Sequence, residues 1–371
     1  MRVKIEDVCM KGSSNLKQSD VVGKNGIYPV YGAAGYLGSI DSFKQSKPYV
    51  AVVKDGAGIG RAMLLPSNSS IIGTMQYLLP KDNILPEYLY YLIKAKHLEK
   101  YYSGATIPHI YFKDYKNEEF DLFSFEIQCQ IINKLKIIEK IIEKQKKEMD
   151  LLDELVKARF VELFGDPRSN PYGFGKKLLR DTCKVVTGNT PSRSVEAYYG
   201  DYVEWIKTDN IVSGLLNPTK ATESLSEEGM KVGRTVEKGS ILMACIAGSI
   251  ASIGRVCVTD RRVAFNQQIS AIVPEEYNIL FLYVLLQLSK EYLVEEINMA
   301  LKGILSKSKL EEKEFIVPPM ELQEQFADFV HQVDKSKLLS LIKLLEQLIT
   351  YLYNIFIIYR QDKGEEVEDH E

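Results

Sequence analysis

The feature that most constrains the fold is an internal repeat. Ile59-Gly60-Arg61 returns as Ile253-Gly254-Arg255, and Glu126-Ile127-Gln128 returns as Glu321-Leu322-Gln323. Matching residues stay about 194 positions apart, whereas the units of a solenoid are only roughly 20 to 50 residues long. The repeat therefore predicts two similar domains rather than a stack of small units.

Length and composition agree with two globular domains. The chain has 371 residues, of which 45% are hydrophobic and 26% charged, as is typical of soluble proteins. An acidic pair, Glu6-Asp7, stands where a signal peptide needs an apolar run. The apolar run at residues 279–286 is far shorter than the roughly 20 residues that span a bilayer. We expect a cytoplasmic protein.

The residue types predict neither a metal site nor catalysis. Five cysteines and four histidines show no zinc-type spacing, and the odd cysteine number argues against a disulfide framework. The glycine-rich run at residues 55–60 lacks the lysine that follows in a phosphate-binding loop. Asn170-Pro171-Tyr172 faintly resembles an amino-methyltransferase motif, but no glycine fingerprint for a methyl donor accompanies it. We expect no cofactor in this chain.

The chain alternates between glycine-rich blocks and long charged segments. Short apolar runs broken by glycines predict strands, and Pro86 is well placed to begin a helix. The residues after 166 are rich in proline and glycine, which indicates a linker. The predicted segments are a first β-rich block at 1–127, a helix at 128–165, a linker at 166–176, a second block at 177–322, a helix at 323–361 and an acidic disordered tail at 362–371.

The two long segments have the heptad spacing of coiled coils. An antiparallel pairing of the two helices within the chain would place the two blocks at opposite ends of a rod. Gln145 lies on the first seam, where an amide fixes register at a cost in stability. The apolar seam residues are Ile131, Leu135, Ile138, Ile142, Met149 and Leu152 in the first helix, and Leu338, Leu341, Leu345, Leu348, Leu352 and Ile355 in the second. Further apolar residues off the seam, among them Ile132, Ile141, Ile342 and Ile349, suggest partner subunits.

Several motifs resemble one family. Residues 26–35 (Gly-Ile-Tyr-Pro-Val-Tyr-Gly-Ala-Ala-Gly) resemble the start of one kind of target recognition domain in type I restriction-modification specificity subunits. Gly188-Asn189-Thr190-Pro191, residues 199–211 and Phe265-Asn266-Gln267-Gln268 resemble a second kind. Residues 317–325 are similar to the family's signature before each long helix, although the first copy, at 123–128, lacks its prolines. The resemblance covers nearly the whole chain.

The resemblance implies a fold and a role. The fold is α+β: two α/β target recognition domains separated by two long helices that form an antiparallel coiled coil, with a pseudo-two-fold internal repeat. The role is that of a non-catalytic subunit that reads a bipartite double-stranded DNA site. Its partners would be two modification (methyltransferase) subunits and, in some assemblies, two restriction subunits. S-adenosylmethionine, ATP and Mg would be bound by those partners.

DNA readout needs amide, hydroxyl and guanidinium groups at base edges, and basic groups at phosphates. The net charge of −3 does not by itself favour a nucleic-acid binder, but five acids lie in the tail, so the remainder is near neutral. Trp205 is expected in the core, with stacking on a flipped base as the alternative. The predicted contacts are Lys54, Arg61, Thr74 and Gln76 in the first block, and Thr190, Ser192, Arg193, Lys207, Asn210, Arg255, Asn266, Gln267 and Gln268 in the second.

Two other functions stay open on the sequence alone. One is a coiled-coil scaffold whose β-rich domains bind peptides, and the other is an enzyme such as a fused methyltransferase. A scaffold should lack the steep salt dependence of DNA binding, and an enzyme should bind a methyl donor by itself. The sequence does not give the recognised bases or their spacing.

Overall fold

The computed structural model describes residues 1–104, 108–295, 297 and 303–362. The predicted disordered tail therefore lies, after Asp362, outside the described residues. The chain divides into two compact units. Unit 1 contains Met1–Glu143 and Leu344–Glu371, and unit 2 contains Lys144–Lys343.

Unit 1 contains a four-stranded sheet in the order β2-β8-β5-β6 and a three-stranded sheet in the order β4-β3-β7. The helix expected after Pro86 is confirmed, with the proline in its first turn. The strands are β1 (Arg2–Lys4), β2 (Cys9–Ser13), β3 (Tyr28–Gly32), β4 (Gly35–Ile40), β5 (Tyr49–Val53), β6 (Ala62–Leu65), β7 (Ser70–Ile71), β8 (Met75–Pro80) and β9 (Glu119–Asp121). The short helices are α1 (Ile5–Val8), η1 (Gln18–Asp20), α2 (Pro86–Ala95), η2 (Leu98–Tyr101) and α3 (Phe112–Tyr115).

Unit 2 contains a four-stranded sheet in the order β11-β20-β16-β18 and a five-stranded sheet in the order β12-β14-β13-β19-β15. Its strands are β10 (Lys176–Leu178), β11 (Cys183–Thr187), β12 (Tyr199–Gly200), β13 (Val203–Ile206), β14 (Ser224–Leu225), β15 (Thr235–Val236), β16 (Ile241–Ala244), β17 (Ile246–Ala247), β18 (Val256–Val258), β19 (Val263–Phe265), β20 (Ile269–Pro274), β21 (Gly303–Ile304) and β22 (Glu314–Ile316). Its short helices are α5 (Leu179–Thr182), η3 (Glu196–Tyr198), η4 (Thr208–Asn210), α6 (Glu227–Val232), η5 (Ile250–Ser252), α7 (Ile279–Leu288), α8 (Lys290–Val294) and α9 (Lys307–Glu311).

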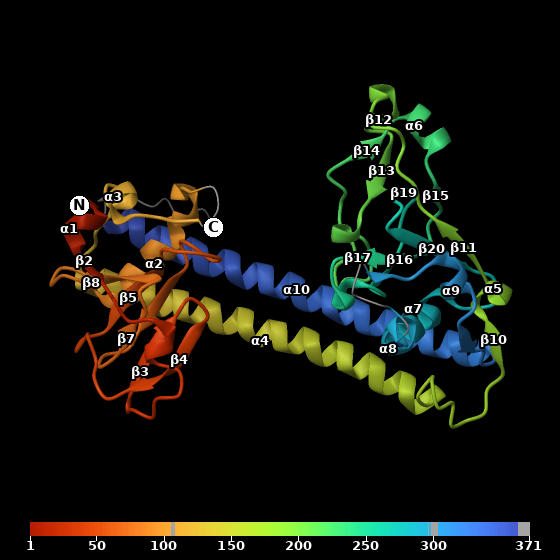
Figure 1. Ribbon diagram of the computed structural model, residues 1–371, viewed down its shortest axis with the longest axis horizontal. Helices are drawn as coiled ribbons and strands as arrows, with labels where there is room; N and C mark the ends of the chain where they lie inside the picture. The colour runs from red at the N-terminus through yellow and green to blue at the C-terminus, as the bar shows by residue number, and fades with distance from the viewer. Residues whose placement is uncertain (105–107, 296, 298–302, 363–371) are drawn as a thin grey trace. The chain divides into compact units, whose positions relative to one another are not determined.

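The two four-stranded sheets have the same strand order, so the sequence repeat is also a structural repeat (Figure 1). Cys9 pairs with Pro80 in the first sheet as Cys183 pairs with Pro274 in the second. In each sheet one of the two central strands, β5 in unit 1 and β16 in unit 2, is buried on both faces. Val50 and Val52 pack into the core that contains α2, while Tyr49, Ala51 and Val53 pack into a second core. Successive residues of a strand point to opposite faces, so β5 serves both cores.

Strand β16 repeats this division in unit 2. Ile241 and Met243 belong to the core around α7, while Leu242 and Ala244 belong to the core under the five-stranded sheet. A strand that is buried on both faces reads as a continuous apolar run, as both β5 and β16 do.

Each block leads into one long helix, α4 (Phe125–Phe164) and α10 (Met320–Asp362), each drawn as a continuous ribbon in Figure 1. Both begin three residues before the predicted positions. Within unit 2 the two helices pack in opposite directions. Gln145 Nε2 donates to Ser340 Oγ at 2.6 Å, and the rings of Phe160 and Phe326 lie 5.4 Å apart. The seam amide predicted at Gln145 therefore has a partner on the other helix.

Most of the predicted seam residues are at least half-buried on α4, and most are exposed on α10. Ile131 is buried, and Leu135, Ile138, Met149 and Leu152 are half-buried. Ile142 is exposed, and its neighbour Ile141 is half-buried in its place. On α10 only Leu348 and Ile355 of the predicted set are half-buried, whereas Leu338, Leu341, Leu345 and Leu352 are exposed. Other half-buried residues of α10 include Lys337, Ser340, Leu344 and Tyr351.

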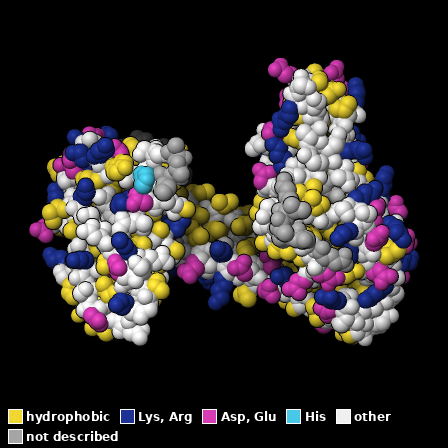
Figure 2. Space-filling view, viewed as in Figure 1, with side chains coloured by type: hydrophobic (Ala, Val, Ile, Leu, Met, Phe, Trp, Pro, Cys, Tyr) yellow, Lys and Arg dark blue, Asp and Glu magenta, His cyan; other side chains and the backbone are white. Residues whose placement is uncertain are grey.

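The helix α10 is strongly apolar over most of its length. Residues Met320–Ile357 are long and apolar enough to cross a membrane by length and composition, with a mean hydropathy of 1.2 in the most apolar window. Figure 2 shows hydrophobic side chains on the surface of the long helices. Leu338, Ile342, Leu345, Ile349 and Leu352 are spaced alternately by four and three residues, and all are exposed. That spacing forms a second apolar stripe along one face.

Candidate functional site

In unit 1, three separate segments meet at the turn between β5 and β6. The backbone amides of Lys54 and Asp55 both donate to the carbonyl oxygen of Thr74, at 3.0 and 3.2 Å. The amide of Ile110 donates to the carbonyl oxygen of Lys54 at 2.9 Å. These bonds fix the turn against the start of β8 and against the segment that contains His109. The turn is therefore a rigid platform for its side chains.

The side chains at this turn form a polar group. His109 Nδ1 lies 2.7 Å from Asp55 Oδ1, and the Lys54 ammonium pairs with the other carboxylate oxygen. Burial raises the pKa of Asp55, but hydrogen bonds from Lys54 and His109 and their charges outweigh it, so the pKa lies below its usual range. Asp55 is therefore ionised near neutral pH. An ionised carboxylate can only accept, so His109 donates through Nδ1.

Arg61 ends the same turn and is exposed. Its guanidinium Nη1 donates to the carbonyl oxygen of Ala33 at 3.3 Å. Gly60 before it has a φ of 81°, and a Cβ there would lie 2.5 Å from the backbone nitrogen of Glu99. Only glycine fits this conformation and this approach. The glycine in the repeated Ile-Gly-Arg motif is therefore structural and directs the arginine outward.

Unit 2 reproduces this junction bond for bond. The amides of Cys245 and Ile246 donate to the carbonyl oxygen of Gln268 at 2.8 and 3.1 Å, and the amide of Leu305 donates to that of Cys245 at 2.8 Å. Arg255, the counterpart of Arg61, donates from Nη2 to the carbonyl oxygen of Thr208 at 3.3 Å. The two units therefore have the same backbone hydrogen bonds at this junction, while most of the side chains differ.

A second group in unit 2 surrounds Trp205, which is buried. Its indole Nε1 donates to the carbonyl oxygen of Asn189 at 3.3 Å. The Arg193 guanidinium lies 5.1 Å from the ring centroid and the Lys207 ammonium 5.2 Å, and both pair with Glu223. Hydrogen bonding from Lys207 lowers the pKa of Glu223 against the effect of burial, with Arg193 assisting. The core position expected for Trp205 is confirmed.

The loop with the Gly-Asn-Thr-Pro motif packs on the turn with the Phe-Asn-Gln-Gln motif. Thr190 Oγ1 donates to the side-chain oxygen of Gln267, and the amide of Gly188 donates to the carbonyl oxygen of Ile269 at 3.0 Å. A Cβ at Gly188 would lie 2.2 Å from the carbonyl oxygen of Asn266. Two motifs nearly 80 residues apart in the sequence therefore form one surface.

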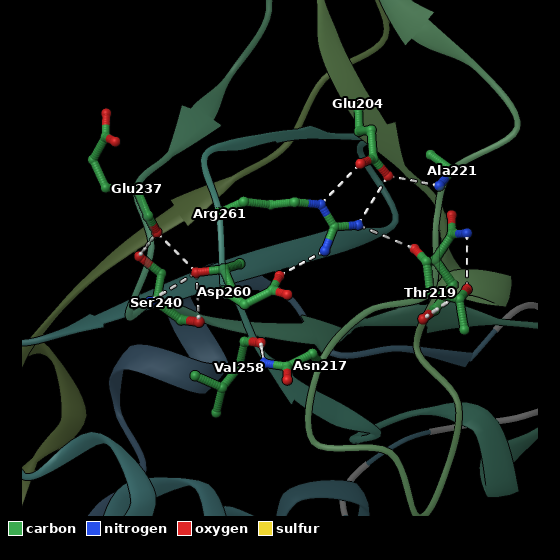
Figure 3. A network of polar contacts seen from close by, with 11 residues as sticks. Glu204, Asn217, Thr219, Ala221, Glu237, Ser240, Val258, Asp260 and Arg261 are labelled. Atoms are coloured by element: carbon green, nitrogen blue, oxygen red, sulfur yellow. Dashed lines mark hydrogen bonds and ion pairs between the residues drawn. The ribbon is translucent and has the colours of Figure 1, made fainter. Parts of the chain in front are cut away.

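A network of ion pairs and hydrogen bonds in unit 2 centres on Arg261 and Glu204 (Figure 3). The Arg261 guanidinium holds Glu204 through two nitrogens, at 2.8 and 2.9 Å, and Asp260 through the third at 2.6 Å. Glu204 also accepts from the amide of Ala221 at 2.7 Å. The hydrogen bonds from Arg261 lower the pKa of Glu204 and raise that of Arg261 itself. The network ties β13, which carries Trp205, to the loop before β19 and to the segment around residue 221.

Of the predicted contact residues, most lie at these junctions and three are buried. Gln76 accepts from the buried Tyr115 hydroxyl at 2.9 Å, Asn210 accepts from the amide of Lys207, and Asn266 accepts from that of Gln268. These three amides serve the fold and do not face solvent. Exposed residues are Arg61, Thr74, Thr190, Ser192, Arg193 and Gln267; half-buried ones are Lys54, Lys207, Arg255 and Gln268.

Asp55, His109 and Glu223 are not among the contact residues predicted from the sequence. A comparison of the two copies could have found the first two, because Asp55 and His109 align with Ile246 and Ile304 on an otherwise shared scaffold. Among the described residues, no group of three or more His, Cys, Asp or Glu side chains could hold a metal ion. On the face shown in Figure 2, basic and acidic side chains are mixed on both units.

Comparison with known proteins gives consistent results. A family described as "Type I restriction modification DNA specificity domain" matches residues 1–149 and 171–350, once on each copy of the repeat. The MjaIX specificity subunit, of a type I restriction enzyme from Methanocaldococcus jannaschii, is 27% identical over 281 residues. That alignment covers 68% of this chain and 63% of the relative's length. The HindI specificity subunit from Haemophilus influenzae is 33% identical over 120 residues, or 32% of this chain and 25% of its own length.

Solved structures with the same fold have low sequence identity. A type I restriction-modification S subunit from M. genitalium has a TM-score of 0.56 at 16% identity, and the match covers 96% of this chain and 95% of that one. A chain from a study of complex assembly in the type I R-M system has a TM-score of 0.53 at 14% identity, covering 98% of both chains. At these identities the likeness concerns the fold alone.

Proposed function

This chain belongs to the family of type I restriction-modification DNA specificity domains, and we propose that it gives a DNA methyltransferase assembly its target sequence. It reads a bipartite double-stranded DNA site, one half with each unit, in the cytoplasm. The observation that carries the proposal is the double family match, since each matched segment contains one complete copy of the junction described above. The chain itself neither methylates nor cuts.

The long helices act as a spacer in this proposal. A helix of 40 residues such as α4 extends about 60 Å at 1.5 Å per residue. The opposite directions of α4 and α10 in unit 2 support an antiparallel coiled coil. Two readers joined by a stiff spacer suit a site whose halves lie about one helical turn, ~34 Å, or more apart.

Two modification subunits bind along these helices, and two restriction subunits join them in an assembly that also cuts DNA. The exposed apolar stripe of α10 supports this, because five large apolar side chains at heptad spacing are costly to leave in water. S-adenosylmethionine, ATP and Mg belong to the partner subunits. The mixed charge on the face shown in Figure 2 also fits an assembly in which partners provide much of the attraction to DNA.

The test is to purify the chain with and without its modification subunits and to measure duplex binding over a range of salt. We expect a stable complex whose affinity for a specific duplex falls steeply with salt. Ile349→Lys, on the exposed stripe, should weaken the complex, while Lys343→Ala, an exposed charge on the same helix, should not. The absence of both a complex and duplex binding would overturn the proposal. Salt-independent peptide binding would instead favour the scaffold function.

A further inference from the structure

The two copies of the junction contain one matched pair of positions with opposite chemistry. In unit 1, Asp55 and His109 form an antiparallel bridge between the β5–β6 turn and the segment before α3. In unit 2, Ile246 and Ile304 form the same antiparallel bridge, as part of β17 and β21. The next residue in each segment repeats the same backbone bond, from Ile110 to Lys54 and from Leu305 to Cys245.

The fold does not require either pair. The surrounding backbone bonds are the same in both units, so the scaffold accepts a polar pair and an apolar pair equally. Ile304 is 48% exposed, which removes most of its value to a core, and His109 is also partly exposed. A partly exposed ion pair adds little stability, commonly less than about 1 kcal/mol. The difference in chemistry therefore points to a ligand rather than to folding.

Each pair has a defined preference for base edges. Since His109 donates to Asp55 through Nδ1, Nε2 is the ring nitrogen left to meet a base edge, and as an acceptor it suits the exocyclic amino group of adenine or cytosine. Ile246, which is half-buried, and Ile304, which is exposed, offer no side-chain hydrogen bond, and apolar side chains suit the methyl group of thymine. Both preferences apply to the major groove, where the four base pairs differ.

We propose that this cross-strand pair is a specificity-determining element in each unit. Asp55 positions His109 to accept from an amino group in one half of the site, and Ile246 with Ile304 contacts a thymine methyl in the other half. Arg61 and Arg255, kept in both copies, contact the phosphates that both half-sites share. The inference rests on the proposed function and adds which residues distinguish the two halves.

The test exchanges the pairs and reads base preference. The chain in complex with its modification subunits is mixed with a duplex library randomised in both half-sites, and bound duplexes are sequenced. Asp55→Ile with His109→Ile should change the preferred base at one or two adjacent positions of one half-site only. We expect a loss of roughly tenfold in discrimination there, as for one good base contact. The reciprocal exchange, Ile246→Asp with Ile304→His, should change only the other half-site.

The matched control is Arg61→Ala, which should weaken binding to all sequences alike without changing the preferred bases. His109→Gln, a milder change, should reduce discrimination at the same position if the double variant does not fold. Unchanged preferences in folded pair variants would overturn the inference and leave the proposed function standing. If the unmodified complex itself selects no sequence, the proposed function fails first.

Discussion

At the scale of single residues, two buried glutamines perform the same task in the two units. Gln128 Oε1 accepts from the amide of Leu85 at 2.9 Å, and its Nε2 donates to the carbonyl oxygen of Phe123 at 2.9 Å. Gln323 accepts from the amide of Asn278 at 3.0 Å and donates to the carbonyl oxygen of Pro318 at 2.8 Å. Each amide joins the first turn of a long helix to the segment that begins α2 or α7. The repeated Glu-x-Gln motif is therefore a structural joint.

Replacing Gln323 by Ala should destabilise the protein by about 1–3 kcal/mol, because one buried and one partly buried backbone group lose their partners. Gln325→Ala is the matched control, since this exposed glutamine lies two residues further along the same helix. It should change stability by less than about 0.5 kcal/mol. Urea unfolding midpoints measure both. Equal effects of the two variants would show that the buried bonds contribute nothing specific.

Only one of the five thiols should react quickly in the native protein. Cys129 is exposed, whereas burial raises the pKa of Cys9, Cys183 and Cys257 to about 12 and that of Cys245 to about 11. The thiolate is the reactive form, so the four buried groups stay unreactive at neutral pH. A chromogenic disulfide reagent should count one thiol natively and five after unfolding. Cys129→Ser should remove the fast thiol; any fast reaction left would contradict the assigned burial.

The sequence indicated the locations of the candidate site better than its residues. Thr190 and Gln267 are joined by a hydrogen bond within unit 2, and Arg61 ends a turn in unit 1. Asn210 and Asn266 were selected for amide chemistry, but the same chemistry caps tight turns, and both amides accept backbone bonds within their own turn. Spacing alone does not distinguish an amide that binds a base from one that closes a turn.

At the scale of elements, the heptad pattern predicted the two long helices, but it did not predict which side of α10 packs on α4. The heptad pattern placed both long helices to within about three residues of their observed starts. However, α10 has apolar residues on several faces, so periodicity permits more than one seam. Which seam forms depends on polar contacts between α10 and α4: Lys337 pairs with Asp153, and Ser340 accepts from Gln145. Such partners are not visible in one helix by itself.

Asp334 is a weak point of this pair. One of its carboxylate oxygens is buried and has no hydrogen-bond partner. Burial raises the pKa of Asp334, although the charges of Lys337 and His331 oppose the effect. A carboxyl with a raised pKa stabilises the fold when protonated, and this contribution is lost as the pH rises through the folded-state pKa. At neutral pH the residue therefore favours unfolding.

Asp334→Asn should raise the free energy of unfolding at neutral pH, measured by urea unfolding, by about 1 kcal/mol or less, because the substitution removes a partly buried charge. The advantage should shrink as the pH falls toward the usual aspartate range, where the native carboxyl also becomes neutral. Asp328→Asn, an exposed position on the same helix, should show no such pH-dependent gain. A variant that is less stable than the native chain at neutral pH would contradict this account.

At the scale of the whole molecule, the spacer proposal predicts a change in the recognised DNA. Deleting one heptad from each long helix removes about 10 Å, or about three base pairs at 3.4 Å each. Sequencing of methylated sites in cells that carry the shortened chain should find unchanged half-sites with a shorter gap. Replacing the same heptads by other apolar heptads of equal length should leave the gap unchanged. A constant gap in the shortened chain would exclude the helices as the measure of spacing.

Unit 2 is a single continuous segment, whereas unit 1 needs both Met1–Glu143 and the stretch that begins at Leu344. A ribosome that has released Lys343 has released all of unit 2, but the final helical turns of unit 1 are still to come. Domains generally fold as units during synthesis. The second unit to be translated is therefore the first that can be completed, and the earlier one must wait as a nascent chain for its last part.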